Sequence, residues 1–477
     1  MLQQEYRMKS KIASTYIVLC TVFLTLFTSC KKSEFAADNH TAYFGGEVEY
    51  PQNRYVLFCQ NNKVIDTLPL NKDNTFFKKF DSLAPGLYSF KHEPEYQYVY
   101  FDKNDSLRVH IDSKDFDQSI VFCGRGDQKN NFLMEMFLRN EKEKNNMFEI
   151  YDYDVKKYNA YIQKVNEANR KFYQSKKEEI NWSDDFDVYA QGMFLYPHYT
   201  RKEIYPIIHK MRTGHDVTHQ LPKNYYDFRK SIDFSNEKLT DFNPFVLYLN
   251  LMLNNVGSIH YHNHFTEVDL ALKTNINKLK IADTLLKNEK VKNIVVNSIA
   301  FQYLLEDQNM VNNQEFLKHY YKIATDKSKK NEILKLGKAI GRLTNGKPLP
   351  DVLVQSLDGK SLPASKLIQK NTILFFWSDK LSSHLIAAHK KAKELQLKYP
   401  NYEFVAINLD SGFSTWKKAL EKYDFGSIRQ YHCNNFEDIK NKWAITKIHR
   451  TLIINKDKTI KNGFTNMFDI RFEDDLK

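Results

Sequence analysis

Three histidines at alternate positions, His260, His262 and His264, are the clearest candidate metal ligands in the chain. Neutral imidazole binds zinc or copper. On a strand all three side chains would share one face, whereas on a helix only His260 and His264 would. No Cys, Asp or Glu stands at a supporting spacing. The run is therefore more typical of a polar loop between helices, and we expect no tightly bound metal and no other cofactor.

The five cysteines are too few and too scattered to form a disulfide framework or a redox pair. Cys30, Cys59, Cys123 and Cys433 lie far apart, and the chain has no C-x-x-C motif. Cys59 and Cys123 each end a short apolar run typical of a strand, so a bridge between them is one alternative. Two buried free thiols are the favoured alternative.

The first thirty residues are typical of a secretory signal. Lys9 and Lys11 precede an apolar run over residues 16–27, which is too short to span a bilayer comfortably. A small-residue pair, Thr28-Ser29, follows immediately before Cys30. This pattern predicts a signal peptide over residues 1–29.

Residues 26–30 resemble a bacterial lipobox, which implies that Cys30 carries lipid and that residues 30–41 form a tether. A plain signal with a chance cysteine is the alternative. Lys31 stands where an Asp would resemble an inner-membrane retention signal. We therefore expect a protein of the cell envelope, lipid-anchored in the outer membrane and facing the periplasm.

The overall composition excludes several classes of protein. A hydrophobic fraction of 42% is too low for a polytopic membrane protein, and 14% aromatic residues are too many for a disordered chain. The formal net charge of +12 is mild for 477 residues, and no dense Arg-rich patch is present. We expect no nucleic-acid partner.

The local patterns predict a multidomain α+β protein. Short apolar runs separated by turn residues about every ten positions predict an antiparallel β-sandwich over residues 42–128. Helical periodicity, as in Val291, Val295 and Ile299, predicts a helical domain over residues 129–345. Residues 346–477 alternate strand and helix and predict an α/β domain, with Ile373–Phe376 as one of its strands.

Several segments of this last region resemble TlpA/ResA-like thioredoxins of the bacterial envelope. They are Gly346–Val352, Leu374–Ser378, Phe404–Asp410, Trp416 and Leu452–Asp457, in the family's order and spacing. The resemblance implies a thioredoxin-like domain over residues 346–477. The N-terminal region likewise resembles a small β-domain of unknown function that often opens such lipoproteins.

The resemblance fails at the positions that carry the family's chemistry. Leu381, Ser382, Ser383 and His384 stand where the family has C-x-x-C, four residues after Trp377. A redox thioredoxin needs a thiolate of lowered pKa at a helix N-terminus and a second thiol to resolve the mixed disulfide.

The family's cis-proline is also absent, because His449 stands in its place. A cis bond before a non-proline residue costs about 2.5–4 kcal/mol, so we expect Ile448–His449 to be trans. Ser382 or Ser383 is expected to cap the following helix, and His384 and His389 to be solvated or to line a groove.

Two functions compete. The first is a redox-inactive, lipid-anchored protein whose thioredoxin-like domain binds an unknown protein or peptide in a groove beside Trp377, Leu381 and His449. The second is a TlpA/ResA-like thiol–disulfide oxidoreductase of cell redox homeostasis. The missing cysteine pair favours the first, with no catalytic residue.

Overall fold

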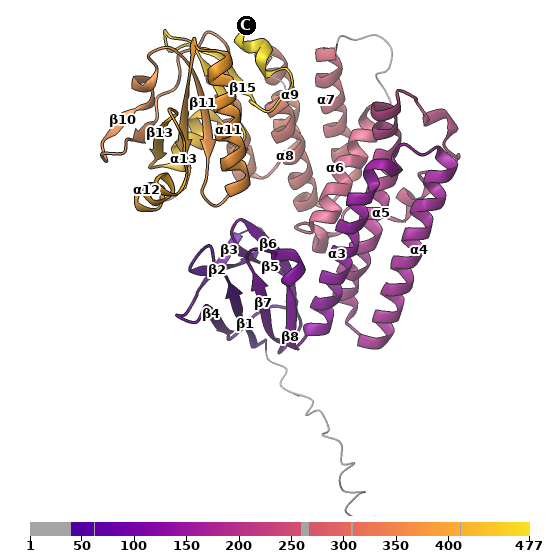
Figure 1. Ribbon diagram of the computed structural model, residues 1–477. Coiled ribbons are helices and arrows are strands. Elements are labelled where there is room, and N and C mark those ends of the chain that lie inside the picture. The colour runs from indigo at the N-terminus through magenta and orange to yellow at the C-terminus, as the bar shows by residue number, and fades with distance from the viewer. Residues whose placement is uncertain (1–39, 62, 259–266, 307–308, 411) are drawn as a thin grey trace, which may run out of the picture.

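The computed structural model describes residues 40–477 except 62, 259–266, 307–308 and 411. Along the chain, a β-rich region is followed by a helical region and then by an α/β region (Figure 1). This order confirms the expected α+β fold class. Within the described ranges, no helix is both long and apolar enough to cross a membrane.

Two four-stranded sheets form the β-rich region. Their strand orders are β4-β1-β7-β8 and β3-β2-β5-β6. The expected antiparallel sheets are confirmed, with the exception of β1 and β7, which run parallel. The strands are β1 Ala42–Glu49, β2 Tyr55–Gln60, β3 Lys63–Pro69, β4 Thr75–Phe80, β5 Gly86–His92, β6 Glu95–Phe101, β7 Ser106–Asp112 and β8 Val121–Arg125, with the short helix α2 Phe116–Ser119 before β8.

Aromatic side chains fill the space between the two sheets. The Phe44 ring lies 5.5 Å from that of Phe58 and 5.9 Å from that of Phe101, measured between centroids. Gly46 pairs with Val109 in the parallel ladder, where a Cβ on residue 46 would lie only 2.1 Å from the Val109 carbonyl oxygen. The close approach of β1 and β7 therefore requires glycine at this position.

The helical region begins directly after the sandwich. Its helices are α3 Asp127–Ile150, α4 Val155–Ile180, α5 Asp184–Thr213, α6 Asn243–Ser258, α7 Glu267–Leu285, α8 Glu289–Glu306, α9 Met310–Ile323 and α10 Lys327–Arg342. Short 3₁₀ turns, Thr218–Gln220, Asp227–Ser231 and Glu237–Leu239, connect α5 to α6. Val291, Val295 and Ile299 are buried on α8, as the helical periodicity predicted.

The α/β region is built on a seven-stranded sheet of order β10-β9-β13-β12-β11-β14-β15. Strands β11, β12 and β13 are parallel, and β14 and β15 form an antiparallel hairpin beside β11. The elements are β9 Leu353–Gln355, β10 Ser361–Pro363, β11 Asn371–Trp377, α11 Ser382–Lys398, β12 Tyr402–Asn408, α12 Phe413–Lys422, β13 Arg429–Cys433, α13 Phe436–Trp443, β14 Thr451–Ile454 and β15 Ile460–Thr465; 3₁₀ turns cover Ala364–Leu367 and Phe472–Leu476.

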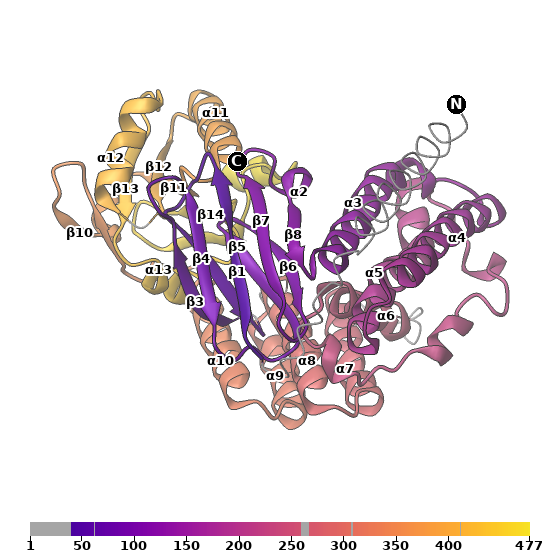
Figure 2. The same cartoon turned by 90° about the horizontal axis from the view of Figure 1, so that it is seen from below.

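The helical and α/β regions share one continuous core. Buried residues of α8 and α10, such as Tyr303 and Ile340, belong to the same cluster as Leu374 of β11 and Trp443 of α13. Figures 1 and 2 show the sandwich and the α/β region on the same side of the helices, with the β5–β6 end of the sandwich turned toward the α/β region. The shared core fixes this arrangement.

Candidate functional site

The loop Ser378–Leu381 joins the end of β11 to the start of α11 and is the position where the sequence placed the degenerate site. Leu381 is the N-cap of α11 and supplies no side-chain hydrogen bond to the helix. Ser382 and Ser383 are exposed and already lie inside the first turn. The prediction that one of them caps α11 is therefore wrong, because the helix begins one residue earlier than a serine cap requires.

A buried carboxylate, Asp410, holds this loop in place. Its Oδ1 accepts a hydrogen bond of 2.5 Å from the Ser378 hydroxyl, and its Oδ2 accepts one of 2.7 Å from the Asp379 backbone N–H. The Asn408 side-chain amide donates to Oδ2 at 2.8 Å. Both anchors follow neighbouring parallel strands, β11 and β12, whose carboxyl ends meet at one edge of the sheet. The edge of the sheet therefore holds the loop in place through Asp410.

Two histidines lie beside the loop, His384 in the first turn of α11 and His449 before β14. Burial, together with the nearby charge of His449, lowers the pKa of His384. Both ring nitrogens of His384 are buried and have no hydrogen-bond partner. Burial also lowers the pKa of His449, and the charges of Lys447 and Arg450 lower it further. The lowered pKa values favour the neutral form of both imidazoles at pH 7. Because His449 acts on His384, the structure places the former C-x-x-C position close to the cis-proline position.

Trp377 and His389 lie beneath the loop, in the core. Trp377 is fully buried, and its Nε1 donates to Gln430 Oε1 at 3.0 Å. The His389 ring packs 5.6 Å from the Trp377 ring, and burial lowers the pKa of His389 to about 4. The expectation that His389 is solvated or groove-lining is wrong, because the inner face of α11 carries it into the core. Trp377 supports the surface from below and does not line it.

The sandwich provides the opposite wall of the site. A pocket of about 390 Å³ lies between the β5–β6 hairpin and the loop. Its lining residues are Lys91, Glu93, Pro94, Tyr96, Ser378, Lys380 and Leu381. Sequence reasoning missed the four residues of the sandwich, because no local signal in a β-hairpin indicates which distant loop it will face.

Cys433, the one thiol of the α/β region, is unsuited to redox chemistry. It ends β13, two strands away from β11, which at about 4.8 Å per strand is roughly 10 Å from the loop. Its side chain is buried, and burial raises its pKa to about 11. A thiol in this state is almost entirely protonated at neutral pH, so it is a poor nucleophile.

The other predicted sites fall into two groups. Cys59 and Cys123 are both free thiols; Cys59 is buried as expected, but Cys123 is exposed on β8. Cys30, His260, His262 and His264 lie outside the described residues. Within the described part of the chain, no group of three or more His, Cys, Asp or Glu side chains is placed to hold a metal ion. In the same part only Glu93–Pro94 is a cis bond, so Ile448–His449 is trans, as predicted.

No cysteine lies in this loop or in the first turn of α11. The loop presents Leu381 where an attacking thiolate would stand, with Asp379 and Lys380 in the loop itself and the imidazoles of His384 and His449 beside it. Sequence reasoning also missed Asp410 as the residue that orders the loop. Its position directly after a predicted parallel strand was a signal that could have identified it.

Comparison with known protein families identifies part of the α/β region. A family model described as Thioredoxin-like matches residues 369–460, which shows a thioredoxin-like domain there. Comparison with curated proteins finds no match.

Several solved structures are similar to parts of the chain. A protein proposed to be a thiol-disulfide oxidoreductase from Bacteroides vulgatus is 22% identical over 28% of this chain and 96% of its own, with a TM-score of 0.26. A domain of a possible thiol-disulfide isomerase from Cytophaga hutchinsonii is 21% identical over 28% and 92%, with a TM-score of 0.26. A thioredoxin-like protein from Bacteroides caccae is 15% identical over 56% and 88%, with a TM-score of 0.33.

Proposed function

We propose that this protein is a lipid-anchored component of the bacterial cell envelope whose thioredoxin-like domain is redox-inactive and serves to bind a protein or peptide. The observation that carries the proposal is the state of the loop at the start of α11. The loop and the first turn of α11 present Leu381 and His384 in place of a cysteine pair. Cys433 is buried, and its pKa is raised. No thiol pair is available for exchange within the described residues.

The composition of the pocket supports binding of a polypeptide segment. Leu381, Pro94 and Tyr96 offer apolar contact, and Lys380 and Glu93 offer charges of opposite sign. The pocket lies between two domains, a common location for binding sites. Lys380 lies close enough to the sandwich to act on His92. Burial lowers the pKa of His92, and the charge of Lys380 lowers it further. A partner seated here contacts both domains at once.

Binding at this site is tested by photo-crosslinking in cells. A benzoylphenylalanine at exposed Lys380 is compared with one at Leu397, which is 86% exposed near the other end of α11, about 22 Å away. The proposal predicts a discrete adduct from position 380, none from position 397, and an unchanged adduct when Cys433→Ser is added. Equal labelling from both positions, or loss of the adduct with Cys433→Ser, contradicts it.

The lipid anchor is supported by the apolar run ending in Thr28-Ser29-Cys30. Cys30→Ala is expected to release the chain from the membrane fraction or to leave it unprocessed, whereas Cys123→Ala is the matched control and leaves the fractionation unchanged. Multiple acyl chains hold a protein firmly where a single chain does not. Membrane retention and mature mass that do not change in Cys30→Ala contradict the anchor.

A further inference from the structure

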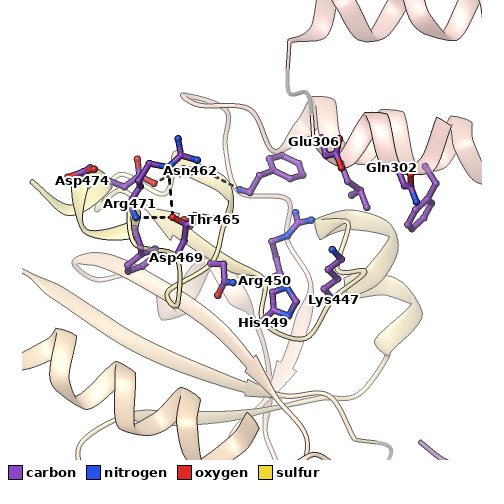
Figure 3. Close-up of a pocket in the computed structure, with 16 residues that line it drawn as sticks. Gln302, Glu306, Lys447, His449, Arg450, Asn462, Thr465, Asp469, Arg471 and Asp474 are labelled. Atoms are coloured by element: carbon purple, nitrogen blue, oxygen red, sulfur yellow. Dashed lines mark hydrogen bonds and ion pairs between the residues drawn. The ribbon is translucent and has the colours of Figure 1, made fainter. Parts of the chain in front are cut away.

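A second, larger pocket lies where the helical region meets the thioredoxin-like domain (Figure 3). Its volume is about 730 Å³, within the usual range of small-molecule sites. The C-terminal end of α8 forms one wall, and the loop before β14, strand β15 and the C-terminal segment form the others. Residues that matter for its chemistry are Phe301, Leu305, Lys447, Arg450, Phe464 and Phe472.

Arg450 is a buried cation without a counter-ion in the described structure. The residue is 9% exposed, and the only hydrogen bond of its guanidinium in the described structure runs from Nη1 to the Gly463 carbonyl oxygen at the long distance of 3.4 Å. The guanidinium lies 4.7 Å from the centre of the Phe464 ring. Burial lowers its pKa to about 10, and no described carboxylate acts in the opposite direction. A buried charge is costly unless it is paired, so this guanidinium is suited to receive an anion.

The carboxylates around the pocket are already engaged by other groups. Asp475 accepts a hydrogen bond of 2.7 Å from Asn462, and Asp474 accepts one of 2.8 Å from Lys477. Asp469 accepts from the backbone N–H of Arg471 at 2.8 Å and lies 3.9 Å from its Nε. The negative charge of Glu306 acts on Lys278 of α7, whose pKa it raises against the effect of burial.

The loop before β14 contributes two cations to the pocket, Lys447 and Arg450, and no carboxylate. Lys447 lines the same pocket and is exposed, and its ammonium group makes no hydrogen bond or ion pair within the described part of the chain. Its charge and that of Arg450 both act on His449, which also lines the pocket. At this loop the two cations favour an anionic group of a ligand, whereas carboxylates line other parts of the pocket.

The apolar side chains that border the pocket indicate which kind of anion it could bind. Phe301 and Leu305 of α8 and Phe464 of β15 are partly buried and border the space, so an apolar group of the ligand would be covered. The planar guanidinium fork matches a carboxylate through two parallel hydrogen bonds. A ligand that carries both a carboxylate and an apolar side chain uses every part of this pocket, whereas a bare inorganic ion uses only its cations.

We propose that this pocket binds the C-terminal carboxylate of a short peptide, with Arg450 as the carboxylate receptor and the phenylalanines of α8 and β15 around the terminal side chain. No residue that lines this pocket belongs to the loop Ser378–Leu381, and His449 is the one residue that the pocket shares with the predicted groove, so the titration below is judged separately from the crosslinking at Lys380.

Calorimetric titration of the full mature chain tests the assignment. The probe is N-acetyl-Ala-Phe, whose terminal residue carries both the carboxylate and an apolar side chain, and its C-terminal amide and inorganic phosphate are the comparison ligands. We expect the peptide acid to bind at least about tenfold more tightly than the amide or phosphate, since hydrogen bonds to charged groups are the stronger ones. Arg450→Met should lower the affinity for the peptide acid by about tenfold or more. Arg108→Met, which removes an exposed arginine on β7 outside the pocket, should change it less than about twofold.

Arg450→Lys keeps the positive charge but loses the planar guanidinium that donates two parallel hydrogen bonds, so it should give an intermediate affinity for the peptide acid. It also keeps the test informative if Arg450→Met does not fold, which melting of each variant reports. Failure of the acid to bind, equal affinity for acid and amide, tighter binding of phosphate, or affinity unchanged in both Arg450 variants would each overturn the proposal.

Discussion

Cys433 should react far more slowly with alkylating reagents in the folded protein than an ordinary thiol does. Burial raises its pKa to about 11, against 9.0 for an unperturbed thiol on the same scale. At pH 8 the thiolate fraction is then about 0.1%, compared with about 10%, so ionisation alone slows alkylation roughly 100-fold. The side chain is also only 3% exposed, which slows the reagent further.

The assay is iodoacetamide labelling at pH 8 with peptide mass mapping over time. Cys123, exposed on β8, is the internal reference. We expect Cys123 to be labelled at least 100-fold faster than Cys433 in the folded chain, and the two rates to converge in urea. Labelling of Cys433 within a few-fold of Cys123 under native conditions would refute both the burial and the raised pKa.

Three further predictions concern stability, each measured by urea unfolding. Asp187 accepts hydrogen bonds from Tyr173, Trp182, Lys177 and Gln191, and these bonds outweigh the effect of burial and lower the pKa of Asp187. Asp187→Asn should therefore lower the free energy of unfolding by about 1–3 kcal/mol at pH 7. This difference should shrink as the pH falls below 3.8, because the wild-type protein then loses the contribution of the ionised carboxylate. Glu203→Ala should lower the free energy of unfolding by about 3–5 kcal/mol, because it leaves Arg229, whose Nε donates to Glu203 at 2.8 Å, without its partner. Glu141→Ala, at the exposed pair with Lys144, should lower it by less than about 1 kcal/mol. Gly46→Ala should cost about 1–3 kcal/mol through the clash with Val109, whereas Gly337→Ala on α10 should be neutral or stabilising by up to about 1 kcal/mol. Equal effects within either matched pair, or a pH-independent Asp187→Asn difference, would contradict these assignments.

Strong apolar patterns made much of the fold predictable. The strand predicted at Ile373–Phe376 is confirmed as the centre of β11, since its residues are buried on both faces. Strand β13 was missed because its sequence, Arg-Gln-Tyr-His-Cys, lacks an apolar run and takes its conformation from pairing with β12 and β9. Tertiary pairing overrode local propensity there.

The site was less predictable than the fold. The chain order located the loop before α11, and the absence of its cysteines was visible directly. The contribution of the sandwich at Glu93 and Tyr96, and the burial of Arg450, depend on contacts between segments hundreds of residues apart. Lys447–Arg450 is a polar sequence typical of a solvated loop, so nothing local indicates that one of its cations is enclosed.

The most direct test of the central claim is an insulin-reduction assay with dithiothreitol on the purified chain. Because the loop offers Leu381 and His384 and the buried Cys433 has no neighbouring thiol in the described structure, insulin should precipitate at the uncatalysed rate, both for wild type and for Cys433→Ser. Turnover above background in wild type that disappears in Cys433→Ser would contradict the account and assign the domain to thiol–disulfide exchange.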